Sequence, residues 1–272
     1  MRLACSSTAL LALAALTLSV MPDSVTAQGR FTSTATDTRR ITQSLAREFD
    51  NLRASKADSW IGYRLPAAPA TRQRCGGSHV ALEPAATVTV MTRLRMGALD
   101  QIRVFTPECD VDTGSVALVW LDGVTADDSA AWLTSLVRDR RTDREWQSRV
   151  GSPAMTALSL QGGDAATRAL IALAKDEERA DLRSRALNAL GDRAGQQAAS
   201  TIAGAVSSDP ELDVKRTAVR ALARLPKDEG IPLLIQVART NKAPELRREA
   251  MQRLGQSNDP RAVQFFEEIL TK

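Results

Sequence analysis

A repeat of 32 residues in the second half of the chain restricts the fold more than any other feature of the sequence. An acid-apolar-base triplet begins at Asp181 and recurs at Asp213 and at Glu245, 32 residues later each time. Each triplet is followed by apolar residues at helical spacing, which form a stripe along one face of a helix. The aligned residues are Ala186, Ala218 and Ala250, then Leu187, Val219 and Met251, then Leu190, Leu222 and Leu254. Because one helical pair cannot bury its apolar face alone, this period predicts a solenoid of stacked helix pairs.

The same register continues on both sides of the three copies. A first helix precedes each triplet, and Leu170, Ile202 and Leu234 are its aligned residues. Apolar residues also occupy the aligned positions one period earlier, at Val150, Ala154 and Leu158, and one period later, at Ala262, Phe266 and Ile269. We therefore predict three to four helical pairs and a closing half-repeat, which make an all-α solenoid over residues 127–272.

These repeats resemble the short bacterial HEAT-like repeats first recognised in phycobiliprotein lyases, whose triplet likewise precedes an Ala-apolar-x-x-Leu helix. The resemblance covers about Arg149 to Lys272, and each repeat is about ten residues shorter than a eukaryotic HEAT unit. The order of segments, with Ser59–Tyr63 and a cysteine-containing sheet before the repeats, is similar to a group of exported bacterial HEAT-repeat proteins. The resemblance implies an α-solenoid and supplies no activity.

The first 27 residues have the features of a secretory signal peptide. Arg2 is followed by an apolar run from Ala9 to Val20 and by small residues up to Ala27, which is the usual order of such signals. The run is about a dozen residues, whereas a membrane span needs roughly 20. Cys5 lies before the run, so a lipid anchor is not expected. We predict an exported mature chain without a transmembrane span, in the periplasm or outside the cell.

Residues 28–126 are predicted to form a flexible leader and a small α+β domain. Gln28 to Asp37 has almost no apolar residues, which favours a flexible leader over residues 28–37. Helical spacing predicts a helix from Thr38 to about Ala57, and Trp60–Leu65 is typical of a strand. Alternating apolar residues then predict antiparallel strands with a turn at Met96–Ala98. The alternating residues are Val80 and Leu82, then Val88, Val90 and Leu94, then Ile102 and Val104, then Val116, Leu118 and Trp120. The predicted fold class is thus α+β, a helix-plus-antiparallel-sheet domain over residues 38–126 followed by the solenoid.

Two cysteines remain after removal of the signal peptide. These are Cys75 and Cys109. Because their number is even and the predicted compartment is oxidising, a disulfide between them is favoured. We predict one disulfide between them. The alternative is a pair of buried free thiols.

The chain lacks the residue patterns of common catalytic and metal sites. Its single histidine, His79, stands beside Ser78, and adjacency does not make a catalytic triad. One histidine and two paired cysteines cannot supply the usual zinc ligands. The glycines follow no phosphate-binding pattern. We predict no metal, no cofactor and no catalytic residue, and hence a protein that is not an enzyme.

The second helices of the repeats are rich in arginine and lysine. We predict that they line the concave face, where stacking would form basic rows. One row is Arg183, Lys215 and Arg247, another is Arg216 and Arg248, and Arg220 lies beside them. Such a stripe could bind an acidic protein segment or an anionic envelope polymer. The alternative is solvated charge and ion pairs between repeats, which contribute little individually.

The function predicted from these features is that of a non-catalytic protein-binding or scaffold module outside the cytoplasm. All tryptophans precede residue 150, so the repeats lack stacking platforms and nucleic acid is not an expected partner. Two alternatives stay open: a lyase or other enzyme of the HEAT-like repeat group, and a structural component of the envelope. The oligomeric state is not predicted.

Overall fold

The computed structural model describes residues 31–69, 71–72, 83–107 and 109–271. The predicted signal peptide, the predicted strand at Val80 and Leu82, His79 and Cys75 lie outside these residues. The disulfide between Cys75 and Cys109 therefore stays a prediction. Within the described part of the chain, no helix combines the length and the hydropathy that a membrane span requires.

The N-terminal part contains a five-stranded mixed sheet of order β2-β7-β3-β4-β5 and a two-stranded piece, β1-β6. Strand β4 is antiparallel to β3 and β5, whereas β7 is parallel to β2 and β3. The sheet is thus mixed rather than purely antiparallel, because alternation along a strand does not reveal the direction of its neighbours. The strands are β1 (Phe31–Thr32), β2 (Thr36–Arg40), β3 (Ser59–Pro66), β4 (Thr87–Arg95), β5 (Ala98–Phe105), β6 (Val111–Asp112) and β7 (Ala117–Asp122).

The prediction of a flexible leader over residues 28–37 is wrong from Phe31 onward, and residues 28–30 lie outside the described part of the chain. Phe31–Thr32 and Thr36–Arg40 are strands that pair with β6 and β7. Every side chain of β2 is exposed, so its composition is polar although its backbone belongs to the sheet. The first helix, α1, accordingly begins later than predicted, at Leu45, with Ser44 as its N-cap.

One face of the sheet packs on helices α1 (Leu45–Ala54) and α2 (Ala126–Val137). The predicted turn between β4 and β5 is confirmed, since Met96 and Gly97 have φ values of 49° and 76°, as a tight hairpin turn requires. The rings of Phe49 and Trp132 stack with centroids 4.1 Å apart. These contacts place α2 between the sheet and the first repeat.

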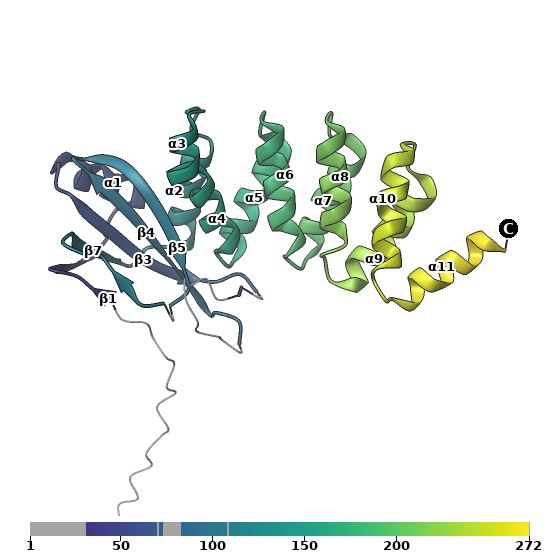
Figure 1. Ribbon diagram of the computed structural model, residues 1–272, viewed down its shortest axis with the longest axis horizontal. Helices are drawn as coiled ribbons and strands as arrows, with labels where there is room; N and C mark the ends of the chain where they lie inside the picture. The colour runs from purple at the N-terminus through teal and green to yellow at the C-terminus, as the bar shows by residue number, and fades with distance from the viewer. Residues whose placement is uncertain (1–30, 70, 73–82, 108, 272) are drawn as a thin grey trace, which may run out of the picture.

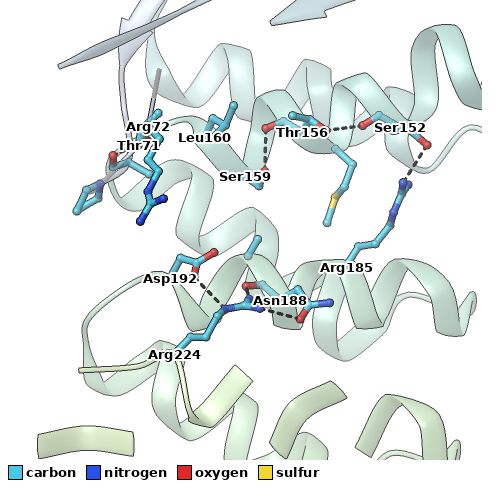
Figure 2. Close-up of a pocket in the computed structure, with 14 residues that line it drawn as sticks. Thr71, Arg72, Ser152, Thr156, Ser159, Leu160, Arg185, Asn188, Asp192 and Arg224 are labelled. Carbon is cyan, nitrogen blue, oxygen red and sulfur yellow. Dashed lines mark hydrogen bonds and ion pairs between the residues drawn. The ribbon is translucent and has the colours of Figure 1, made fainter. Parts of the chain in front are cut away.

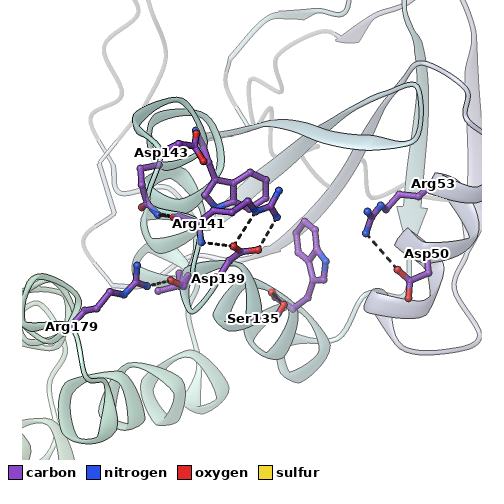
Figure 3. A network of polar contacts seen from close by, with 11 residues as sticks. Asp50, Arg53, Ser135, Asp139, Arg141, Asp143 and Arg179 are labelled. Carbon is purple, nitrogen blue, oxygen red and sulfur yellow. Dashed lines mark hydrogen bonds and ion pairs between the residues drawn. The ribbon is translucent and has the colours of Figure 1, made fainter.

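The loop after α2 is fixed by a network of charged side chains (Figure 3). Arg141 donates hydrogen bonds to Asp139 at 3.0 and 2.7 Å, and its guanidinium lies 3.2 Å from the centroid of the Trp146 ring. The hydrogen bonds from Arg141 lower the pKa of Asp139. Arg179 donates to the carbonyl oxygen of Val137 at 2.5 Å. The loop is thus joined to the turn between the two helices of the next repeat.

The repeats stand in a row that runs from the sheet to the C-terminal end of the chain (Figure 1). Their first helices begin at Asp164, Gln196, Lys227 and Pro260, close to the predicted period of 32 residues. The predicted α+β fold class is confirmed. The helices are α3 (Arg144–Trp146), the π-helix η1 (Gln147–Gly151), α4 (Ser152–Leu160), α5 (Asp164–Asp176), α6 (Ala180–Gly191), α7 (Gln196–Ser208), α8 (Leu212–Leu222), α9 (Lys227–Thr240), α10 (Pro244–Gly255) and α11 (Pro260–Leu270).

The sheet and the solenoid share one hydrophobic core, which runs from Leu45 to Phe265. Around Gln161 the two parts are also joined by hydrogen bonds: its amide donates to the Ala126 carbonyl at 2.7 Å and accepts from Ser129 at 3.0 Å. Ser129 in turn contacts the Tyr63 hydroxyl at 3.1 Å. Burial raises the pKa of Tyr63, which keeps this buried cluster uncharged. The predicted division between residues 126 and 127 therefore falls inside a continuous core.

Candidate binding groove

A groove of about 690 Å³ lies where the sheet meets the repeats (Figure 2). We call it the junction groove. It is lined by the segment after β3, by α4, by α6 and by Arg224 just beyond α8. Residues from both parts of the chain thus form its walls, and the shared core fixes their relative position.

The α4 wall of the groove carries a row of hydroxyl groups. Ser152, Thr156 and Ser159 share one face because their spacings are those of successive helical turns. The hydroxyls of Thr156 and Ser159 donate to main-chain oxygens of their own helix, at 3.1 and 2.8 Å. That of Ser152 accepts from Arg185 at 3.0 Å. Each of these oxygens keeps a lone pair to accept a hydrogen bond.

The opposite wall carries arginines and an amide. Arg224 pairs with Asp192 at 2.9 Å and donates to the side-chain oxygen of Asn188 at 3.3 Å. Asp192 and Arg224 occupy the same position in successive repeats, 32 residues apart. The repeat period brings these two positions side by side, and one repeat has an acid there where the next has a base.

The groove carries more positive than negative charge. Arg72, Arg185 and Arg224 line it together with one acid, Asp192. Among the described residues, no carboxylate lies within ion-pair distance of Arg72 or Arg185, in contrast to Arg224. Two guanidinium groups of the groove are thus available to an anionic ligand.

The predicted row of Arg183, Lys215 and Arg247 does not lie open to solvent. Arg183 is 7% exposed and forms a two-pronged ion pair with Asp209 of the next repeat, at 2.7 and 2.9 Å. It also donates to the carbonyl oxygens of Glu177 and Glu178. Arg247 donates to two carbonyls of the turn before its own helix, and Lys215 is half-buried. Arg183 is therefore a structural residue rather than a ligand-binding one, which corrects its assignment.

The Arg183–Asp209 pair has a clear electrostatic signature. The hydrogen bonds that Arg183 donates to Asp209 raise the pKa of Arg183. Burial acts to raise the pKa of Asp209, but hydrogen bonds from Arg183 and from the Glu211 backbone outweigh it, so that this pKa lies below its ordinary value. Both groups are charged in the folded protein and hold two repeats together.

Other arginines of the predicted stripe do lie on the surface of the second helices. Arg220 and Arg248 are exposed and Arg216 is partly exposed. Arg216 and Arg220 lie one helical turn apart on α8, and Arg224 follows just beyond the helix and lines the junction groove. Arg216 contacts Asp213 at 3.4 Å, within its own helix. We call this surface, with Arg185 and Arg248, the open face.

The sequence revealed only part of this site. Arg185 and Arg224 belong to the arginine-rich second helices, but they lie outside the rows that alignment of the triplets predicted. Arg72 follows a strand in a segment without a motif, and no sequence signal connects it to the repeats. Among the described residues, no three histidine, cysteine, aspartate or glutamate side chains are grouped as metal ligands.

Comparison with protein families identifies the repeats. The family model described as HEAT repeats matches residues 198–272. This segment consists of HEAT repeats. The resemblance drawn from the triplets is thereby confirmed, and the preceding helical pair, α5 and α6, has the same period and register. No curated protein sequence matches the chain.

Two solved structures show a partial likeness to the chain. Human deoxyhypusine hydroxylase in complex with glycerol has 21% identity and a TM-score of 0.39, over 47% of this chain and 43% of the hydroxylase. The CpcE and CpcF complex of phycocyanin lyase from Nostoc sp. has 17% identity and a TM-score of 0.40, over 53% of this chain and 89% of that one. The chain thus spans less than half of the hydroxylase's length.

Proposed function

We propose that the protein is a non-catalytic scaffold whose open face holds an acidic segment of a protein partner. The observation that carries the proposal is the line of Arg216 and Arg220 on α8 and Arg224 just beyond it. This line continues into a groove with two guanidinium groups that have no carboxylate partner among the described residues. Stacked helical repeats build extended surfaces suited to such segments. A concentration of one charge sign speeds association and selects partners of the opposite sign.

The bonding of the groove hydroxyls supports binding rather than covalent catalysis. A serine or threonine nucleophile needs a base within hydrogen-bond reach. The hydroxyls of Thr71, Thr156 and Ser159 donate instead to main-chain oxygens, and that of Ser152 contacts an arginine. Within the described residues, no carboxylate or histidine is hydrogen-bonded to these four hydroxyls.

The proposed place of action is outside the cytoplasm, in the periplasm or beyond the cell. Its support is the sequence of residues 1–27, with its basic start, apolar run and small-residue end. Fusion of these residues to a reporter enzyme that is active only after export tests this part. An inactive fusion would contradict it.

The binding proposal is tested by charge reversal on the open face. The Arg216→Glu, Arg220→Glu, Arg248→Glu variant is immobilised beside the native chain and exposed to an envelope extract. The matched control is Arg47→Glu, Arg140→Glu, Arg144→Glu, which changes the net charge equally at exposed positions elsewhere. We expect a partner bound by the native chain and the control, lost by the open-face variant and weakened by salt. Equal recovery by all three chains would refute the proposal.

A further inference from the structure

We infer that the junction groove recognises an extended peptide in which acidic and apolar residues alternate. This inference rests on the proposed scaffold function and specifies the ligand of the same site. It specifies the backbone conformation and the side-chain pattern of the acidic segment. Three properties of the groove lead to it: complementary hydrogen-bonding walls, apolar lining, and the placement of cations that have no carboxylate partner among the described residues.

The two walls of the groove offer opposite hydrogen-bonding groups. On α4 the hydroxyls of Thr156 and Ser159 already donate to main-chain oxygens, so what they offer a ligand is acceptor lone pairs. On α6 the side-chain oxygen of Asn188 accepts from Arg224, which leaves its NH₂ group as a donor. An extended peptide backbone presents both N–H and C=O groups along its length. It can therefore satisfy both walls at once.

Apolar side chains lie among the polar ones. Pro69, Met155 and Leu160 line the groove together with the hydroxyls. Burial of an apolar ligand side chain against them contributes roughly 25 cal/mol per Å² of buried area. A peptide with only acidic side chains would gain little from this lining, because it has no apolar side chain to bury there.

The cations are arranged at different places along the groove. Helix α4 carries the apolar Met155 and Leu160, whereas Arg185 and Arg224 belong to the opposite wall. Arg72 lies away from Arg185 along the groove (Figure 2). Successive side chains of an extended peptide point to opposite sides. Alternation of acidic and apolar residues therefore brings carboxylates to one side and apolar groups to the other. Guanidinium groups bind carboxylates with paired hydrogen bonds.

The test uses fluorescein-labelled peptides of ten residues and fluorescence anisotropy with the full-length mature protein. The first peptide alternates aspartate with leucine or alanine, the second replaces each aspartate by asparagine, and the third keeps the aspartates but replaces each leucine or alanine by serine, so that it has the same net charge as the first. We expect the first peptide to bind at least about tenfold more tightly than the other two. Equal binding of the aspartate–serine peptide would overturn the inference, since the groove would then recognise charge alone.

Variants locate the binding to the groove. The double variant Arg72→Glu, Arg185→Glu is expected to weaken binding of the first peptide at least about tenfold. The exposed control Arg47→Glu, Arg144→Glu should leave the affinity for this peptide unchanged. Thr156→Val removes one acceptor at constant shape and is expected to weaken binding about twofold to tenfold. Circular dichroism melting checks that each variant is folded.

The outcomes separate this inference from the scaffold proposal. One outcome is that reversal of Arg216, Arg220 and Arg248 abolishes binding of the envelope partner, while the Arg72 and Arg185 variant binds the first peptide unchanged. This outcome would support the scaffold proposal and refute the inference about the groove ligand. Failure of both sets of variants to alter binding would refute both proposals.

Discussion

At the scale of single residues, the role of an arginine depends on its neighbours in space. Arg183, Lys215 and Arg247 occupy the same repeat position, yet Arg183 alone faces an aspartate across the repeat interface. The residue one period after Asp209 is Asn241, which carries no charge for Lys215 to pair with. The aligned triplets predicted a common row of cations, but a residue 26 positions further along decides whether each cation is paired.

We predict that Arg183→Ala destabilises the protein by about 3–5 kcal/mol, because it leaves Asp209 buried without its partner. Urea unfolding gives this free energy directly. The control is Arg216→Ala, which removes an exposed pair with Asp213 and is expected to cost less than about 0.5 kcal/mol. Similar losses in both variants would contradict the assignment of Arg183 as a structural residue.

The lowered pKa of Asp209 predicts a specific acid sensitivity. A carboxyl group whose pKa is depressed by folding stabilises the protein above its unfolded pKa of about 3.9, and this contribution is lost as the pH falls through the folded value. Asp209→Asn should therefore be less stable at neutral pH and lose less stability than the native chain below about pH 4. Parallel curves of unfolding free energy against pH would contradict this prediction.

At the scale of helices, glycines show where the repeats are packed most closely. A side-chain carbon at Gly230 in α9 would lie 2.3 Å from the carbonyl oxygen of Leu222, whereas one at Gly204 in α7 would meet nothing within 4 Å. Both glycines lie inside first helices. Close approach of α8 and α9 therefore requires glycine at position 230, whereas the packing around α7 leaves room for a side chain at position 204.

We predict opposite effects of alanine at these two glycines. Gly230→Ala should destabilise the protein by about 1–3 kcal/mol through steric crowding. Gly204→Ala should stabilise it by about 0.5–1 kcal/mol, because alanine favours the helix. Thermal unfolding of the two variants and the native chain measures both signs, and a shared sign would refute the explanation.

Secondary structure followed from the sequence wherever the pattern is local. The period of 32 residues located the helical pairs, and Met96 and Gly97 marked the turn between β4 and β5. Strand β2 was missed because its side chains are polar and exposed, and its pairing with β7 joins segments about 80 residues apart. Such long-range backbone pairing leaves no local periodicity in the sequence.

At the scale of the whole molecule, the continuous core couples the sheet to the repeats. Because Ser129 links Tyr63 of the sheet to Gln161 by buried hydrogen bonds, we expect the sheet and the repeats to unfold together. All four tryptophans precede the HEAT repeats, whereas most helical signal comes from the repeats. Tryptophan fluorescence and far-ultraviolet circular dichroism should therefore give coincident urea transitions. Two separated transitions would show that the parts unfold independently.

The candidate site itself belongs to this largest scale. Arg72, Arg185 and Arg224 come from three distant segments, and only docking of the sheet against α4, which itself packs on α6, brings them to one groove. The sequence could indicate that the second helices are basic. It could not indicate that a residue beyond β3 completes their binding surface, because no periodicity connects the two parts.

The location of the groove beside the sheet also bears on how such a chain can change during evolution. Because the repeats share one period and register, a duplication of one unit beyond α8 would extend the row while leaving the groove and its sheet wall intact. The same duplication between α4 and α6 would separate the groove's two walls. Variation in length should therefore accumulate away from the sheet, and the distance from the groove to the far end would change in steps of one repeat.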